Sequence, residues 1–369
     1  MFARTARARM RSVVVLAAGI LVAVLLPATA QAHGGDGDGV KTIASGLDNP
    51  RGLAFDSEGA LYVTEAGRGG AGPCMHGPEG DDVCFGTSGA ITKIKRGEQE
   101  RVVSGLPSLA PVDGTQAIGP SDVAFQDETM LFTVGLGADP AVRANVPREG
   151  GNLGWLLRAS EHKKVDRVAD IAGYEAKANP DGGMPDSNPN SLVATESSTV
   201  VVDAGGNSLV SVSRNGKVST LAVFPGQPIS VPNAPPEMQA VPTSVVRGPD
   251  GAYYVGQLIG FPFLVGAAKV YRVEPGEKPT VFADGFTNII DIGFGHDGSL
   301  YVLEIAHNGL LSGDPNGALI KVREDGTHQT VLDKGLTMPG GLALDEEHAY
   351  VSNCGTCPGK GTVVRVPLS

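Results

Sequence analysis

Residues 48–67 read DNPRGLAFDSEGALYVTEAG and contain two short apolar runs, residues 53–55 and 61–63, on either side of a polar turn. Two such runs joined by a short turn are typical of a β-hairpin. The pattern recurs along the chain, usually behind a proline, in copies that begin near residues 48, 118, 188, 240, 288 and 338. Each copy supplies a third strand and usually a fourth. We therefore predict an all-β chain that folds as a six-bladed β-propeller with four antiparallel strands per blade.

The last copy is incomplete, because residues 363–366 supply a third strand and no fourth strand follows. Residues 40–47 have the same pattern as the end of the first blade at residues 102–106. A closed ring protects strand edges that an open array leaves unpaired. We predict that residues 40–47 complete the sixth blade, so that residues 40–369 form a single propeller domain.

The first 32 residues have the pattern of a secretory signal peptide. Four arginines precede an apolar run at residues 13–26, and Ala30-Gln31-Ala32 fits a cleavage site. The apolar run is shorter than the roughly 20 residues of a membrane-spanning helix. We predict a signal peptide at residues 1–32, a flexible leader at residues 33–39, no membrane span after cleavage, and a secreted or extracytoplasmic location.

Removal of residues 1–32 leaves 25 Lys and Arg against 40 Asp and Glu, a net charge of −15. Nucleic acids and anionic lipid surfaces select basic patches, so this balance argues against both as partners. The 52 Gly and 26 Pro of the chain punctuate it at short intervals, which fits an all-β fold. We expect a monomer that binds a small molecule or a protein partner at the propeller face.

Four cysteines lie beyond the signal region: Cys74, Cys84, Cys354 and Cys357. An even number of cysteines in an exported chain predicts two disulfide bonds. Three pairings are open, and the local one joins Cys74 to Cys84 and Cys354 to Cys357. The CGTC sequence at residues 354–357 is alternatively a redox or metal motif, although no thioredoxin-like βαβ pattern surrounds it.

Two insertions interrupt the repeat. Residues 68–88 form a Gly-rich loop within the first blade and carry two of the cysteines. Residues 158–187 extend the second blade, and the apolar residues at positions 165, 168, 171 and 174 have the spacing of a helix that residues 180–183 would end. Neither insertion is long enough to bury a core of its own, so we expect no second domain.

Chemistry is expected at the face where the first strand of each blade begins and the second strand ends. The first set of candidates is the second residue after each proline or its equivalent: Gly52, Asp122, Ser191, Ser244, Asp291 and Gly341. Asp122 and Asp291 fall in blades two and five, which are opposite each other in a six-bladed ring. Two channel carboxylates suit a hard divalent cation such as Ca²⁺, or a substrate hydroxyl. The alternative is that each one caps backbone N–H groups of neighbouring strands.

A second set of candidates follows the second strand of each blade: Glu65, Gly135, Asp203, Gln257, Glu304 and Asn353. Five of these six residues are polar, and Glu65 and Glu304 occur in the similar contexts YVTEAG and YVLEIA. Acidic side chains at matching positions predict an electronegative rim that attracts a cation or a polyhydroxyl ligand. The alternative is that they satisfy the ends of the strands. His307 follows Glu304 closely, either as a base or ligand that acts with it or as a solvated loop residue.

Several longer stretches carry a more specific likeness: GLPSLAPVDGTQAIGPSDVAF (105–125), DIAGYEAKANPDGG (170–183), SNPNS (187–191), GFTNIIDIGFGHDGSLYVLEIA (285–306), GLLSGDPNGALIKV (309–322) and YVSNCGTCPGKG (350–361). In these stretches the chain resembles the ScyD/ScyE family of exported propellers, and the resemblance covers essentially the whole mature sequence. It implies an exported six-bladed propeller of the NHL or TolB-like kind. It carries over no catalytic residues.

Three functions follow from these patterns. The first is a secreted binding or scaffold propeller, because the chain contains no G-x-S-x-G, H-E-x-x-H, P-loop or dinucleotide motif. The second is a metal-assisted extracellular hydrolase, similar to gluconolactonase-like propellers, that uses the carboxylates of the two sets. The third is an oxidoreductase similar to quinoprotein sugar dehydrogenases, although no array of basic residues to hold a quinone is evident. The sequence leaves open whether the protein is an enzyme.

Overall fold

The structure is a computed structural model, and it describes residues 39–77, 80–160 and 164–368. The chain separates into two units, residues 1–35 and 36–369, and the second unit contains the fold. The predicted signal peptide lies outside the described residues, as does the predicted leader at 33–39 apart from Gly39. No helix among the described residues is long and apolar enough to cross a membrane.

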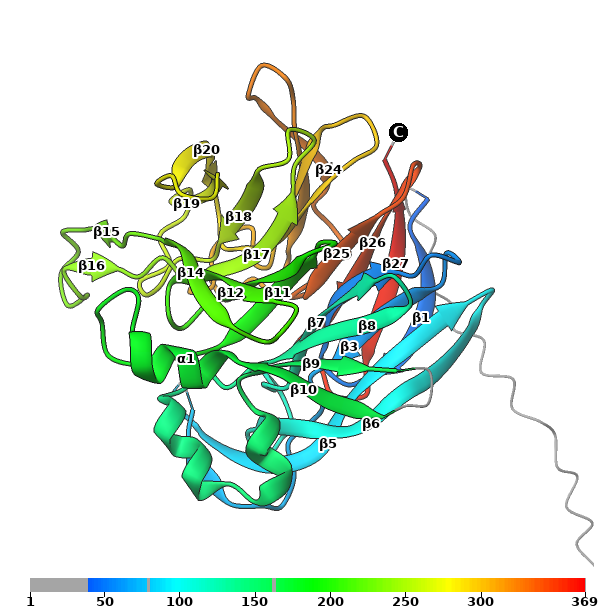
Figure 1. Cartoon of the computed structure of the whole chain (residues 1–369). Helices are drawn as coiled ribbons and strands as arrows, with labels where there is room; N and C mark the ends of the chain where they lie inside the picture. Colours follow the sequence, from blue (N-terminus) through cyan, green and yellow to red (C-terminus); the bar gives the residue numbers. More distant parts are fainter. Residues whose placement is uncertain (1–38, 78–79, 161–163, 369) are drawn as a thin grey trace, which may run out of the picture. The chain divides into compact units, whose positions relative to one another are not determined.

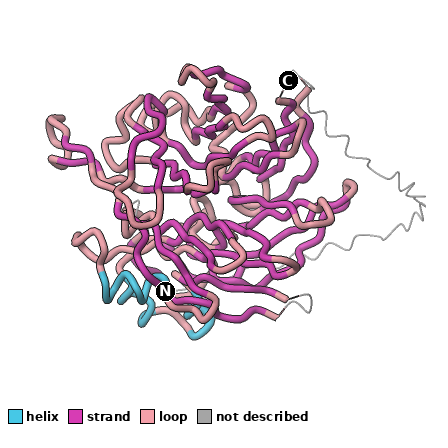
Figure 2. The backbone as a smooth tube through the Cα atoms, turned by 45° about the horizontal axis from the view of Figure 1, so that its top comes forward, coloured by secondary structure: helices cyan, strands magenta, loops and turns pink. Residues whose placement is uncertain are grey.

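Six antiparallel sheets form the blades (Figure 1), and helix is confined to one edge of a structure made mostly of strands (Figure 2). Blade one contains β2 (Pro50–Phe55), β3 (Leu61–Glu65), β5 (Asp82–Lys95) and β6 (Glu98–Ala110), with β4 (Cys74–His76) added beside β5. Blade two contains β7 (Pro120–Gln126), β8 (Thr129–Val134), β9 (Trp155–Ala159) and β10 (Val165–Asp170). Blade three contains β11 (Pro189–Ala194), β12 (Ser198–Asp203), β13 (Ser208–Ser213) and β14 (Val218–Val223).

The other three blades follow the same plan. Blade four contains β17 (Pro242–Arg247), β18 (Tyr253–Gln257), β19 (Ala268–Val273) and β20 (Thr280–Phe286). Blade five contains β21 (Ile289–Phe294), β22 (Leu300–Glu304), β23 (Ala318–Val322) and β24 (His328–Leu332). Blade six contains β25 (Gly341–Leu344), β26 (His348–Asn353), β27 (Gly361–Pro367) and β1 (Lys41–Leu47). A two-stranded ribbon, β15 (Gln227–Pro228) with β16 (Glu237–Met238), precedes blade four.

The ring is closed by the two ends of the repeat region. β1 pairs antiparallel with β27, with Lys41 opposite Arg365 and Leu47 opposite Gly361, so the first and last strands lie side by side (Figure 1). The first strands of the six blades contact one another in a closed series, β2–β7–β11–β17–β21–β25 and back to β2. The predicted six-bladed propeller, closed by residues 40–47, is confirmed.

The hydrophobic core is divided among the junctions between blades. One apolar cluster lies at each of the six junctions, and the one between blades six and one includes Leu47, Leu53, Val63 and Val363. The second strands are covered on both faces, and every residue of β3 and of β22 is buried. This explains why these strands read as continuous apolar runs, as strands covered on both faces do.

The two insertions differ from the sequence expectation. Residues 68–88 are not simply a loop, because β4 pairs with an extension of β5 that places Cys74 opposite Cys84. The helix expected from position 165 is wrong in its first half, where β10 pairs with β9 as the fourth strand of blade two. The helix α1 (Ile171–Ala178) starts only after Asp170, whose side chain accepts the Gly173 N–H. Pairing with the exposed edge of β9 satisfies the backbone and outweighs the local spacing.

Closure by β1 predicts that Leu47→Ala destabilises the propeller by about 2–5 kcal/mol, because it leaves a cavity between blades six and one. Leu47 is 1% exposed. Urea-induced unfolding followed by tryptophan fluorescence measures the loss. Thr42→Ala, at an exposed position of the same strand, is the control and should change the stability by less than about 0.5 kcal/mol. Equal effects of the two substitutions would contradict closure through this strand.

Candidate functional site

The channel carboxylate of blade two is bonded to the neighbouring blade. Asp122 Oδ2 accepts hydrogen bonds from Ser191 Oγ at 2.9 Å and from the Leu192 N–H at 3.0 Å, both in β11. Its Oδ1 accepts the Val123 N–H at 2.8 Å. A Cβ at Gly52 would lie 2.1 Å from this Oδ1, so only glycine fits at that position of β2. Asp122 therefore links three consecutive blades at the channel wall.

Asp291 does the same between blades five and six. Its Oδ2 accepts the Leu342 N–H at 2.7 Å, and its Oδ1 accepts the Ile292 N–H at 2.8 Å. Burial raises the pKa of Asp122 to about 7. Burial, together with the negative charge of Asp122, raises the pKa of Asp291 well above its usual range. The negative charge of Asp122 thus disfavours ionisation of Asp291.

The remaining members of the first set complete the channel wall without a further charge. Ser191 Oγ accepts the Val245 N–H of blade four at 3.2 Å, and Ser244 is fully buried. A Cβ at Gly341 would lie 2.7 Å from the Arg51 carbonyl oxygen and from Gly52 Cα. Among the residues that the structure describes, no three His, Cys, Asp or Glu side chains are grouped to hold a metal ion. The channel geometry matches capping of backbone N–H groups by its polar side chains.

The second set does not form an exposed rim. Glu65, Asp203, Gln257 and Glu304 are each 1% exposed or less. Four side chains of the set instead accept the N–H of a residue that leads into the first strand of their own blade. The acceptor and donor residues are Glu65 and Asp48, Asp203 and Asn188, Glu304 and Thr287, and Asn353 and Thr337. The expected electronegative rim is therefore corrected, because its carboxylates are turned inward to satisfy backbone groups. Binding by these residues stays a prediction.

Glu65 belongs to an ionic network on blade one. Arg101 donates to Glu65 Oε1 at 2.9 Å and to Oε2 at 2.6 Å, and also to Asp48 Oδ2 at 3.0 Å. Arg68 donates to the same Asp48 oxygen at 2.7 Å. Thr92 Oγ1 donates to Glu65 Oε1 at 2.6 Å. The buried carboxylate is thereby paired and fully hydrogen-bonded, which is what a buried charge requires.

Glu304 and His307 form a hydrogen-bonded pair on blade five. Glu304 Oε1 accepts the Thr287 N–H at 2.6 Å, and Oε2 contacts His307 Nδ1. Burial raises the pKa of Glu304, and the His307 and Thr287 hydrogen bonds oppose that rise. The His307 side chain is 42% exposed and the Glu304 side chain 2% exposed. The pair thus has an inner anion and an outer imidazole within reach of solvent.

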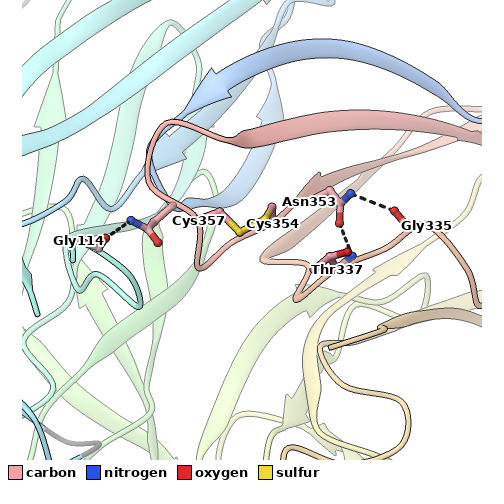
Figure 3. The surroundings of a disulfide bond; sticks show 7 residues. Gly114, Gly335, Thr337, Asn353, Cys354 and Cys357 are labelled. Carbon is pink, nitrogen blue, oxygen red and sulfur yellow. Dashed lines mark hydrogen bonds between the residues drawn. A yellow bond between two sulfur atoms is a disulfide. The ribbon is translucent and has the colours of Figure 1, made fainter. Parts of the chain in front are cut away.

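The other three members of the second set are uncharged. Asn353 accepts the Thr337 N–H at 2.6 Å through Oδ1 and donates to the Gly335 carbonyl at 3.0 Å through Nδ2 (Figure 3). Gln257 donates to the Ala240 carbonyl at 3.2 Å. Gly135 has no side chain, and a Cβ at this position would lie 2.5 Å from Asn188 Oδ1, too close for a larger residue. All three positions fix the approach of a loop to a blade.

Both disulfides join neighbouring cysteines, Cys74 to Cys84 and Cys354 to Cys357, so the local pairing is confirmed. The second disulfide lies directly beyond Asn353, at the end of β26 (Figure 3). The Cys354 N–H donates to the Thr337 carbonyl at 2.8 Å, and the Asn49 N–H donates to the Cys357 carbonyl at 3.4 Å. The CGTC loop is therefore tied both to its own blade and to blade one.

Exposed apolar side chains gather on one side of the propeller. We call this side the loop face, meaning the side that carries residues 111–119, 179–188, 258–267 and 305–317. Among the described residues seven large apolar side chains are well exposed, and Val281 and Phe282 in β20 are the two that lie elsewhere. The other five lie on the loop face: Val112, Met184, Phe261, Val265 and Leu311.

A group of acidic residues was missed at the sequence level. Glu175, Asp181 and Asp186 lie in α1 and the loop after it, close to Asp203 of the second set. We interpreted the segment 180–183 only as the end of a helix. The sequence did contain a signal for this group. Glu175, Asp181 and Asp186 fall within 12 residues that contain a single lysine.

No protein-family profile matches the chain, and no curated protein matches its sequence. Its fold is similar to that of a Bacteroides thetaiotaomicron protein of unknown function, with a TM-score of 0.55 and 11% identity over 89% of this chain and 75% of that one. It is also similar to a glucose dehydrogenase, with a TM-score of 0.52 and 13% identity over 89% and 99% of the two chains. Virginiamycin B lyase from Staphylococcus aureus has a TM-score of 0.49 and 11% identity over 89% and 99%.

The closed ring of six four-stranded sheets defines the class of the protein as a six-bladed β-propeller. At identities of 11–15% the likeness shows the fold alone, and one fold supports many unrelated functions.

The ionic network predicts that Arg101→Met destabilises the protein by about 3 kcal/mol, because it leaves the buried Glu65 carboxylate without a cationic partner. Arg68→Met is the matched control. Arg68 is 55% exposed and makes a single bond to Asp48, so its loss should cost less than about 1 kcal/mol. Urea unfolding at neutral pH measures both. A smaller effect at Arg101 than at Arg68 would contradict the assignment.

The raised pKa of Asp122 predicts a pH dependence of stability. Its folded-state pKa is about 7 against an ordinary 3.8, so the folded protein keeps a proton that the unfolded chain loses between about pH 4 and 7. The free energy of unfolding should therefore fall as the pH rises through this range and level off above it. Urea midpoints at several pH values measure the slope, which Asp122→Asn should reduce. The exposed substitution Glu196→Gln should leave it unchanged, and identical slopes in wild type and Asp122→Asn would disprove the assignment.

Proposed function

We propose that the protein is an extracytoplasmic binding propeller, similar to the ScyD/ScyE family, that docks a protein partner on its loop face. The observation that carries this proposal is the concentration of exposed apolar side chains there: five of the seven in the described residues. Exposed apolar patches on a folded protein are typical of interaction sites, and Phe261, Val265 and Leu311 come from two adjoining loops. The two local disulfides and the signal-like N-terminus support an extracytoplasmic location.

The centre of the proposed surface spans the loops of blades four and five. Phe261 and Phe263 have ring centroids 6.1 Å apart, and a Cβ at Gly309 would lie 3.0 Å from Val265 Cγ2. Asn288 joins the two loops, because it donates to the Leu258 carbonyl and accepts the Leu310 N–H, both at 3.1 Å. Loops held in place in this way lose little conformational entropy on binding.

A protein suits this surface better than a small molecule does. Small ligands bind in concave sites that enclose most of their surface. Two surface hollows, of about 520 and 580 Å³, are lined by residues of blades four and five and of blades five and six, respectively. Neither hollow is lined by Phe261, Val265 or Leu311. Apolar and aromatic side chains on an open surface match the core of a protein interface.

The metal-assisted hydrolase has less support in the channel. Both oxygens of Asp122 and of Asp291 already accept backbone N–H groups, so these carboxylates have limited freedom to act on a substrate. No feature of the described residues specifically supports the quinoprotein alternative. A binding role does not require a reactive group in the channel.

Site-specific photocrosslinking in cells that produce the protein tests the docking surface. A photoreactive residue at position 265 or 311 should give one discrete heteromeric adduct, identified by mass spectrometry. The same residue at position 281, where Val281 is 49% exposed, is the control and should give none. Phe261→Ser should reduce adduct formation at position 265 at least tenfold. Adducts between two copies of the chain, equal labelling at position 281, or no adduct at all would each contradict the proposal.

A further inference from the structure

Three carboxylates lie around Gly205 and Gly206, where the loop after α1 meets the end of β12. A Cβ at Gly206 would lie 2.6 Å from Glu175 Oε2 and 3.4 Å from Asp203 Cγ, so these two acidic groups flank the same glycine. A Cβ at Gly205 would lie 2.9 Å from Asp186 Oδ1. Because the two glycines have no side chains, the carboxylates occupy the space beside them.

The Glu175 carboxylate is buried without any compensation. The residue is 2% exposed, its Oε1 has no hydrogen-bond partner, and no described residue donates a hydrogen bond to the side chain. Asp186 Oδ1 is also buried and unpartnered. Each such oxygen carries the full cost of lost hydration. Native proteins rarely leave a carboxylate in this state unless something absent from the chain itself completes its environment.

No positive side chain neutralises the group. The ion pairs of the described residues include none of Glu175, Asp181, Asp186 and Asp203. Burial raises the pKa of Glu175 to about 8, and the charges of Asp203, Asp181 and Asp186 add to the rise. The electrostatic environment therefore favours an added cation.

We propose that Glu175, Asp186 and Asp203 form a binding site for Ca²⁺. Calcium takes six to eight oxygen ligands in irregular geometry, from carboxylates, amide and backbone carbonyls and water. Asn179 Oδ1, one helical turn after Glu175, is a further buried oxygen without a partner. Asp181 lies at the edge of the group, where its Oδ2 accepts the Asn207 amide at 2.9 Å. The proposal concerns blade three and does not depend on the docking role of blades four and five.

In the structure these side chains are not grouped at ligand distances. Binding therefore requires the Glu175 and Asp186 side chains to rotate toward Asp203. Asp203 itself is fixed, because it accepts hydrogen bonds from Ser187 Oγ at 2.7 Å and from the Asn188 N–H at 2.6 Å. A cation would thus tie α1 and the loop at residues 179–188 to the rigid end of β12.

Calorimetric titration of the chelator-treated protein with CaCl₂ tests the site directly. We expect binding of one Ca²⁺ per chain in wild type and a loss of affinity of at least tenfold in Glu175→Gln. Asp186→Asn should also weaken binding and serves as the second variant if Glu175→Gln does not fold. Glu196→Gln, at an exposed position of the same blade, and Asp122→Asn should bind as wild type does. Absence of Ca²⁺ binding, or binding unchanged in both Glu175→Gln and Asp186→Asn, would overturn the proposal.

Urea unfolding gives a second readout that separates a cation site from a protonated structural acid. In EDTA, Glu175→Gln should be as stable as wild type or more stable, because it replaces a buried carboxyl group whose ionisation is disfavoured with a neutral side chain of similar shape. In excess Ca²⁺ the order should reverse, because only wild type gains stability from binding. If Glu175 is merely a neutral buried acid, Ca²⁺ will leave the order unchanged, and that result counts against the site.

Discussion

The backbone N–H that leads into the first strand of a blade needs an acceptor, and in four of the six blades the fold depends on a side chain for it. A buried donor without a partner costs about 1–3 kcal/mol. In these four blades the structure meets the need with the side chain that ends the second strand of the same blade. The four direct acceptors are Glu65, Asp203, Glu304 and Asn353, at 2.6–2.8 Å from the nitrogen. The polar positions at the strand ends are therefore primarily part of the architecture.

The channel wall extends the same solution from one blade to the next. Asp122 and Asp291 accept the N–H groups of Leu192 and Leu342, each in the following blade. The first strand of each blade has one edge that pairs with no other strand and faces the channel. The N–H groups on that edge therefore need acceptors other than the backbone carbonyls of a paired strand. Closure by β1 then ensures that no blade lacks a neighbour. Carboxylates in a propeller channel are thus no sufficient sign of catalysis.

The fold could be predicted because its signals are local and repeated. The paired apolar runs around residues 53–55 and 61–63 recur six times, and the missing strand at the C-terminal end has its counterpart at residues 40–47. The positions of Asp122 and Asp291 in the channel followed from the same count. The partners of their Oδ2 atoms could not be predicted, because those hydrogen bonds cross to another blade. The fit of Asp122 against Gly52 depends on how closely two backbones approach, which no sequence pattern records.

The acidic group at blade three was hidden for a related reason, since Glu175 and Asp203 are far apart in the sequence and meet only through the fold. The acceptor at the end of the second strand has different partners in this blade than in the others. The buried carboxylate of blade one is paired with Arg101, that of blade five contacts His307, and blade six uses the neutral Asn353. Blade three has Asp203 without a cationic partner among the described residues, and further acidic groups beside it. An architectural acceptor needs one carboxylate, and the additional acidic groups beside Asp203 are the ones that the proposed Ca²⁺ site would use.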